Sequence, residues 1–181
     1  MMENLLAAVR EAYSRAALRP DEKHPFPVGA ALAESLGYAR PLLTDYPSAA
    51  EAFAGVSCVP AFAGLDARMT VLDLGCGAGL DSLAVAPRVR KVIGLDFSAE
   101  MLARAALHLE TVQGEAGRLP FAAASFDAVL ANGIFNPTPR REAIFSEIAR
   151  VLRPGGCAWG AELILQAPLG EEARSRANWF A

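Results

Sequence analysis

The chain has 181 residues and a net charge of −3, which favours a single domain with a short accessory segment. Hydrophobic residues make up 53% of the sequence, but charged residues recur too often to leave the stretch of about 20 apolar residues that crosses a membrane. No basic stripe and no block of like charge is present, so we expect no nucleic-acid partner and no membrane binding. These features predict a protein that acts on a small-molecule substrate.

The cysteine content points to a reducing compartment. Cys58, Cys76 and Cys157 are an odd number and include no CxxC pair, which argues against a disulfide framework and against a zinc site, so no metal is expected. The N-terminal sequence mixes acidic with apolar residues and lacks a small-residue cleavage site, which argues against a signal peptide. We therefore expect a cytoplasmic protein.

Residues 1–67 are predicted to form a helical cap or lid segment. Apolar residues recur at helical spacing at Leu5, Val9, Tyr13 and Ala16. This spacing predicts an amphipathic helix that ends near Arg19. Five prolines divide residues 20–47, where only residues 28–37 have a helical composition. Ser48 and Glu51 form an S-x-x-E capping box before residues 52–54, which predicts a short helix that Gly55 ends.

Residues 68–181 show short apolar runs that alternate with amphipathic stretches. The pattern predicts strands at 70–74, 91–96, 110–113, 126–131 and 157–166, and helices at 79–86, 99–108 and 139–152. Pro139 suits the first turn of the last helix, and residues 153–156 (RPGG) are expected to stop it before a buried strand that begins at Cys157. Strands joined by helical crossovers run parallel, so the pattern predicts a doubly wound α/β sheet.

A glycine-rich turn, residues 75–79 (GCGAG), follows the first predicted strand directly. Glycines let the chain turn sharply and let a ligand lie against bare backbone, although such a turn can also serve tight packing alone. Asp96 ends the second strand 17 residues after Gly79, near the interval typical of dinucleotide and adenosyl binders. Its carboxylate could accept two hydrogen bonds from a ribose diol, or belong to the turn before Ser98, which can cap the next helix. Both interpretations can hold together.

Two later segments should reach the same edge of the sheet. Glu115 follows the third strand, where it could meet an adenine amino group or be a solvated loop acid, with neither interpretation favoured. The strand near residues 126–132 ends in Asn132 at the carboxyl edge, where open α/β sheets bind their ligands.

Five ordered segments resemble the signature of class I methyltransferases. They are residues 71–79 (VLDLGCGAG), 92–101 (VIGLDFSAEM), 114–121 (GEAGRLPF), 126–132 (FDAVLAN) and 150–156 (RVLRPGG). The resemblance implies a Rossmann-like sheet that binds S-adenosylmethionine and releases S-adenosylhomocysteine. It implies cofactor contacts at Asp73, Gly75, Cys76, Gly77, Gly79, Asp96, Phe97, Met101, Glu115, Ala116, Asn132, Gly133 and, from the N-terminal helix, Tyr13. Asp73 would support the loop or the amino group of the methionine part.

Residues 131–136, the helix that follows them and the cap are similar to the arsenite methyltransferase-like branch. Trivalent arsenic is held by sulfur ligands, yet Gly133 and Phe135 stand where that branch would be expected to place a cysteine. The substrate contacts considered are Cys58, Phe135 and Asn136, although a buried cysteine is more often a small hydrophobe. The acceptor is thus a metalloid or a small organic nucleophile.

Methyl transfer needs alignment of donor and acceptor and does not require a dedicated base. Tyr13, His24 or Tyr46 could assist proton removal from an acidic acceptor, and none is assigned as catalytic. A cofactor-binding protein without turnover is the alternative function. An NAD-dependent oxidoreductase is disfavoured because residues 75–79 give GxGxG and not GxGxxG.

Class I sheets usually close with two further antiparallel-paired strands, and only residues 167–181 follow the last predicted strand. We therefore expect a shortened C-terminal edge. An open edge strand seeks a partner, which suggests a homodimer through this edge.

Overall fold

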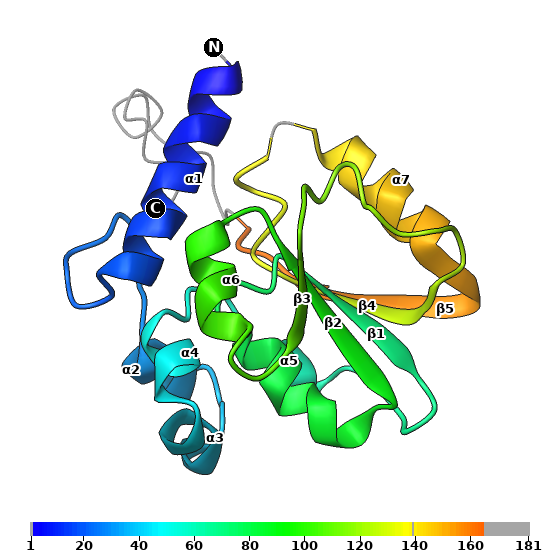
Figure 1. Ribbon diagram of the computed structural model, residues 1–181, viewed down its shortest axis with the longest axis horizontal. Helices are drawn as coiled ribbons and strands as arrows, with labels where there is room; N and C mark the ends of the chain where they lie inside the picture. The colour runs from blue at the N-terminus through cyan, green and yellow to red at the C-terminus, as the bar shows by residue number, and fades with distance from the viewer. Residues whose placement is uncertain (1, 139, 165–181) are drawn as a thin grey trace.

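The structure is a computed structural model that describes residues 2–138 and 140–164. Five strands form one sheet in the order β3-β2-β1-β4-β5, and every neighbouring pair runs parallel (Figure 1). They are β1 (Thr70–Leu74), β2 (Lys91–Asp96), β3 (Glu110–Gln113), β4 (Phe126–Asn132) and β5 (Leu152–Ala161). The predicted parallel α/β sheet is confirmed.

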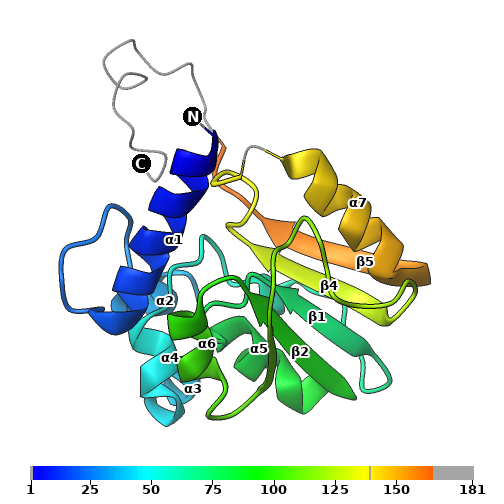
Figure 2. The same cartoon turned by 45° about the horizontal axis from the view of Figure 1, so that its top comes forward.

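Helices cover both faces of the sheet (Figures 1 and 2). They are α5 (Leu80–Val85), the short η2 (Ala86–Arg88), α6 (Ala99–Ala105) and α7 (Arg141–Val151). Side chains alternate between the faces along β1: Val71 packs with Val85 of α5, whereas Leu72 and Leu74 pack with Ile148 of α7. The predicted cap of α6 is confirmed, because the Ser98 hydroxyl accepts a hydrogen bond from Met101 N at 3.2 Å.

Three central strands end level with one another. Leu74, the last residue of β1, pairs with Leu95 of β2 on one side and with Ala131 of β4 on the other. The connections that leave these strands therefore start side by side, at one edge of the sheet. Gly75 N and Cys76 N both donate to Leu95 O, at 2.7 and 3.0 Å, which fixes the start of the glycine loop against β2.

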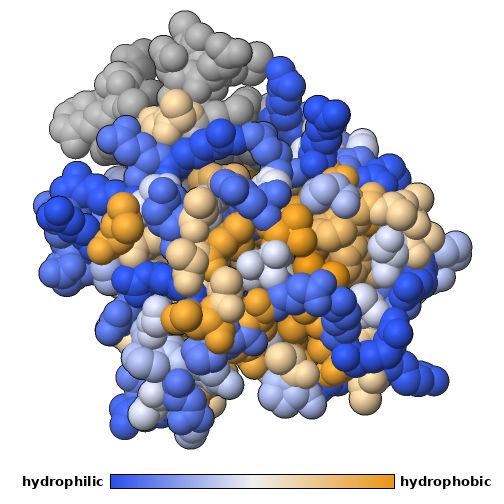
Figure 3. Space-filling view, in the orientation of Figure 1, coloured by the Kyte–Doolittle hydropathy of each residue, from blue (hydrophilic) through white to orange (hydrophobic). Residues whose placement is uncertain are grey.

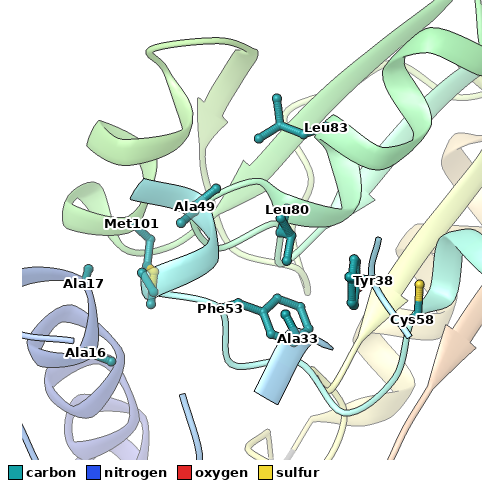
Figure 4. Close-up of a cluster of buried hydrophobic side chains, with 12 residues drawn as sticks. Ala16, Ala17, Ala33, Tyr38, Ala49, Phe53, Cys58, Leu80, Leu83 and Met101 are labelled. Atoms are coloured by element: carbon teal, nitrogen blue, oxygen red, sulfur yellow. The ribbon is translucent and has the colours of Figure 1, made fainter. Parts of the chain in front are cut away.

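The segment before β1, residues 2–67, lies against α5 and α6, and we call it the cap. It contains α1 (Met2–Leu18), α2 (Ala30–Ser35), α3 (Arg40–Asp45), α4 (Pro47–Glu51) and the short η1 (Val59–Ala61). Buried side chains of the cap such as Tyr38 and Phe53 form one cluster with Leu80 of α5 and Met101 of α6 (Figure 4). In the ranges that the structure describes, no helix combines the length and apolar character needed to cross a membrane.

The short helices of the cap differ from their prediction. Ser48 and Glu51 make no capping box, because α4 already begins at Pro47, Ser48 lies inside it and no side chain caps it. The helix ends at Glu51, before residues 52–54, which the prediction had included. Helix α3 was not predicted, since its prolines suggested a loop; Pro41 instead occupies a first-turn position, where the missing N–H costs nothing. The helix predicted over 28–37 is the shorter α2.

Strand β5 also differs from its prediction. It begins at Leu152, immediately after α7. Between the pairs Phe126–Leu152 and Ala128–Cys157, β4 advances by two residues while β5 advances by five. The RPGG segment was predicted to stop the helix and precede the strand, but it lies within the strand as a bulge. The strand ends at Ala161; residues 165 and 166 of the predicted strand, and Pro139, lie outside the described residues.

Cys157 is exposed and not buried as predicted. The reason is that β5 pairs with β4 on one side only, and the described residues supply no strand on its other side. Self-association through this edge stays a prediction.

Two of the signature segments are joined by one guanidinium. Arg150 of α7 donates to Phe121 O at 2.7 Å and to Leu119 O at 3.1 Å, and it is paired with Glu147 at 2.7 Å. Glu147 in turn accepts from Leu119 N at 2.6 Å. Hydrogen bonds from Arg150 are the main reason why the pKa of Glu147 is lowered to about 2. The pair anchors the connection that leads into β4.

We predict that Arg150→Met lowers the free energy of unfolding by about 1–3 kcal/mol at pH 7, because two carbonyls and a carboxylate lose their donor. Stability that comes from a depressed carboxyl pKa is present above the unfolded value, 4.5, and is lost as the pH falls towards about 2. The difference between variant and wild type should therefore shrink over that range in urea titrations.

The matched control is Arg40→Met, which removes an exposed pair with Glu34 and should change stability by about 0.5 kcal/mol or less. Equal effects of the two variants would contradict the structural role of Arg150.

Candidate cofactor-binding site

A cavity of about 990 Å³ lies at the edge where β1, β2 and β4 end, between the sheet and the cap. Its size is at the upper end of the range of about 300–1,000 Å³ that is usual for small-molecule sites. On the face shown in Figure 3, hydrophobic side chains gather between the α1 side and the α7 side, and hydrophilic residues surround them. The cavity therefore combines apolar walls with a few polar groups.

The glycine loop forms the cavity floor. Gly75 has φ +74°, and a Cβ at this position would overlap the Ile134 side chain. Gly77 has φ +54°, and a Cβ there would meet only Met101 Sδ, at 3.8 Å. The first glycine is thus required by packing, whereas the second leaves bare backbone facing the cavity, which is the arrangement that admits a ligand against the chain.

Asp96 stands at the end of β2 beside this loop. Its Oδ2 accepts from Gly77 N at 2.9 Å and its Oδ1 accepts from Ser98 N at 2.8 Å. A carboxylate has about four lone-pair sites, so Asp96 can hold the loop and still accept a hydrogen bond from a ligand. Burial raises the pKa of Asp96, and the backbone donors oppose that shift. Both interpretations of this residue made from the sequence are therefore compatible with its geometry.

Residues after β2 and β3 form the part of the cavity that is covered by α1. Phe97 follows Asp96, and the guanidinium of Arg10 lies 5.8 Å above the centre of its ring. Arg10 also forms an ion pair with Glu115. Tyr13, one helical turn further along α1, contacts the Phe97 ring edge-on with 6.2 Å between ring centres. Helix α1 thus closes over this part of the cavity.

A buried hydrogen-bond network borders the cavity at the end of β4. Asn132 donates to Asp81 Oδ2 at 2.8 Å and to Ser57 O at 2.7 Å, and it accepts from Val56 N at 2.9 Å. The Tyr38 hydroxyl donates to the other oxygen of Asp81. The network joins β4, the first turn of α5 and the cap.

Most of the residues selected from the sequence line this one cavity. They are Tyr13, Gly75, Cys76, Gly77, Asp96, Phe97, Met101, Glu115, Ala116, Asn132 and Gly133. The lining does not include Asp73, Gly79, Cys58, Phe135 or Asn136. Asp73 is buried beneath the loop and accepts from Ser82 Oγ at 2.6 Å, and Gly79 lies against Ala105 and Leu109 of the α6 region. Asp73 and Gly79 therefore support the loop from behind. The substrate contacts considered from the sequence, Cys58, Phe135 and Asn136, do not line the cavity.

Sequence reasoning did not single out Arg10, Tyr38 or Asp81. A signal existed for Arg10, which lies one helical turn before Tyr13 and hence on the same face of α1. A signal also existed for Asp81, which follows the glycine loop by two residues, but an acid in the first turn of a helix has an ordinary explanation in the helix dipole. No sequence feature indicated Tyr38.

We predict that Gly77→Ala removes binding of S-adenosylhomocysteine, the product implied by the sequence resemblance, because its methyl group would occupy the bare-backbone surface. The control is Gly155→Ala in β5, where φ is +82° and an added Cβ meets nothing within 4 Å. Both variants should lose about 1–2 kcal/mol of stability to the positive φ, but only the first should lose binding in isothermal titration. Retained affinity in Gly77→Ala would show that the ligand does not lie against this loop.

Comparisons with known proteins agree with this geometry. A family model described as a methyltransferase domain matches residues 71–156. The chain is 34% identical over 152 residues to an arsenite methyltransferase of Halobacterium salinarum, an alignment that covers 78% of this chain and 39% of that protein. It is 41% identical over 99 residues to a demethylmenaquinone methyltransferase of Lactococcus lactis, which covers 49% of this chain and 39% of that protein.

A solved structure shares the fold over more of the chain. The arsenic(III) S-adenosylmethionine methyltransferase from Chlamydomonas reinhardtii superposes with a TM-score of 0.61 and 26% identity, over 82% of this chain and 54% of that one. The chain thus spans about two fifths to about half of the length of these relatives. The predicted resemblance is confirmed: residues 71–156 match a methyltransferase domain, and the chain is similar to S-adenosylmethionine-dependent methyltransferases, with arsenite methyltransferases among them.

Proposed function

We propose that this protein transfers a methyl group from S-adenosylmethionine to a small organic acceptor. The observation that carries the proposal is the convergence of the bare backbone at Gly77 and the buried carboxylate of Asp96 in one cavity, joined by a hydrogen bond of 2.9 Å. A nucleoside needs both features, since its sugar hydroxyls require an acceptor and its flat body requires a surface without side chains.

The order of the strands along the cavity wall matches the order of the parts of the cofactor. Phe97, Glu115 and Ala116, after β2 and β3, would hold the adenine; Asp96 would hold the ribose hydroxyls; and residues 75–77, after β1, would hold the methionine part. When bound, the cofactor supplies a methyl group on a positively charged sulfur. The protein's own contribution is to hold donor and acceptor in line, which can account for much of the rate of a displacement.

Tyr13 does not serve as a base at neutral pH, so the proton that a phenol or quinol acceptor loses would pass to solvent. Burial, followed by the charges of Asp96 and Glu162, raises the pKa of Tyr13 to about 12. Tyr13 therefore keeps its proton and acts as an apolar wall with a hydrogen-bonding tip. Phe53, Ile134 and Pro137 line the cavity as well and exclude water from the space next to the glycine loop.

The walls favour an organic acceptor over arsenite. Among the described residues, Cys76 is the one cysteine that lines the cavity, while Cys58 is buried outside the lining and Cys157 is exposed on β5. Burial raises the pKa of Cys76 well above its ordinary value, so it remains a thiol, and thiolates are the form that binds soft ions. A single protonated thiol does not provide the several sulfur ligands that trivalent arsenic requires.

We predict that the protein binds S-adenosylhomocysteine and not NAD in isothermal titration, and that Asp96→Asn weakens this binding at least about tenfold, since hydrogen bonds to a charged acceptor are lost. Asp127→Asn is the matched control, because this carboxylate also accepts from a backbone N–H, Thr70 N at 2.7 Å, at the amino end of β4. It should lower the melting temperature and leave the affinity unchanged. Binding of NAD alone would reject the proposed function.

We further predict that turnover with S-adenosylmethionine yields methylated phenol or quinol acceptors and no methylated arsenic when arsenite is supplied with excess thiol. Mass spectrometry of the products decides between the two acceptor classes, because the sulfur ligands needed for arsenite do not line the cavity. Methylated arsenic would overturn the organic-acceptor assignment, and binding without turnover of any acceptor would support the non-catalytic alternative.

A further inference from the structure

The order of the strands sets the direction of the cavity. Glu115 follows β3, Asp96 ends β2, Gly75 follows β1 and Asn132 ends β4, and these strands are consecutive neighbours in the sheet. Neighbouring strands lie about 4.8 Å apart, so the Glu115 and Asn132 ends are separated by about 14 Å across three spacings. An adenosyl group at the β2–β3 end therefore places the amino-acid end of the cofactor near Asn132.

A carboxylate lies at the Asn132 end of the cavity. Asp81 lines the cavity beside Asn132, and only 6% of its surface is exposed. Both of its oxygens accept hydrogen bonds, one from the Tyr38 hydroxyl and one from Asn132 Nδ2 at 2.8 Å. Both donors are neutral, so the charge of Asp81 is hydrogen-bonded but not neutralised.

Among the residues that the structure describes, no lysine, arginine or histidine side chain neutralises the charge of Asp81. The ion pairs of residues 2–138 and 140–164 involve neither Asp81 nor its buried neighbours Asp73 and Asp96. The arginines that line the cavity, Arg10, Arg118 and Arg140, are exposed at its surface, and Arg10 is already paired with Glu115. A buried carboxylate without a counter-ion is costly, and burial accordingly raises the pKa of Asp81. The cavity interior is complementary to a cation.

We propose that Asp81 binds the α-ammonium group at the amino-acid end of the cofactor, an inference that rests on the function proposed above. Each Asp81 oxygen keeps a lone pair for the ammonium after accepting from Tyr38 or Asn132. Asp73, which the sequence resemblance offered for this amino group, does not line the cavity and has Ser82 as its partner. The geometry therefore assigns the ammonium to Asp81 and leaves Asp73 as a support of the loop.

The cap takes part in this recognition. Tyr38 lies in the cap, as does Ser57, whose carbonyl oxygen accepts from Asn132 at 2.7 Å and lies 3.2 Å from the Tyr38 hydroxyl oxygen. The carboxylate is thus held in place by one donor from the cap and one from the sheet. Tyr38 and Asn132 are positioning residues, and Asp81 is the group that contacts the ligand.

The test compares two ligands that differ in one group: S-adenosylhomocysteine and its analogue in which hydrogen replaces the α-amino group. Isothermal titration of the wild type should give an affinity for S-adenosylhomocysteine about tenfold to 100-fold higher, the range expected for a charged hydrogen-bonded pair. Asp81→Asn should weaken S-adenosylhomocysteine by the same factor and leave the analogue within about twofold. The asparagine can preserve the local network, since its amide can donate to the Tyr38 oxygen while its carbonyl accepts from Asn132.

Asp73→Asn is the matched control, because it removes a neighbouring buried carboxylate that does not face the cavity. It should change the affinities for the two ligands by the same factor, and Tyr38→Phe should retain the discrimination between them. Equal affinities of the wild type for both ligands would overturn the role of Asp81, even where a variant does not fold, and so would equal weakening of both ligands by Asp81→Asn. Failure of the wild type to bind S-adenosylhomocysteine at all would instead reject the proposed function.

Discussion

The cavity depends on how one side chain, Asn132, joins the cap to the sheet. Its oxygen accepts from Val56 N and Ser57 N, and its nitrogen donates to Ser57 O and Asp81. Every one of these partners is a group that would lose its bonding to water on burial, and each unsatisfied group would cost about 1–3 kcal/mol. The end of β4 therefore fixes where the cap lies, and the space between cap and sheet edge follows from that position.

Much of the sheet could be predicted from the sequence, because local patterns decide its strands. The runs that became β1, β2 and β3 have the predicted bounds. The central strand β1 is buried throughout, and a buried parallel strand has a continuous apolar sequence. The start of β5 could not be predicted in the same way, since the RPGG segment carries strong turn residues. Pairing with β4 overrides them, and Gly156 fits there because a Cβ would come within 2.9 Å of Asp127 O. Tertiary contact, not local preference, decided this element.

The residues of the candidate site also differ in how far the sequence could predict them. Gly75, Gly77 and Asp96 could be found because backbone conformation and strand position require particular residues at fixed spacing. For Arg10 and Asp81 the sequence signal was not sufficient, since an arginine or an aspartate on a helix is usually solvated and its role depends on what another segment places opposite it. Arg10 acquires its role from Glu115, 105 residues away, and Asp81 from Asn132, 51 residues away. Such pairs are set by topology.

The two ends of the cavity are closed by contacts of unequal strength. At the end of the cavity beside β3, α1 is linked to the loop after β3 by the Arg10–Glu115 pair, whose side chains are 50% and 61% exposed. Such surface pairs contribute about 0–1 kcal/mol and weaken with salt. At the other end, Asn132 and Asp81 are joined inside the protein, where a broken hydrogen bond leaves a buried group without water. Breaking the Arg10–Glu115 pair therefore costs less than breaking the contact between Asn132 and Asp81. The hydrogen bonds from Tyr38 and Asn132 fix the position of the Asp81 carboxylate, as the proposed recognition of a cation requires.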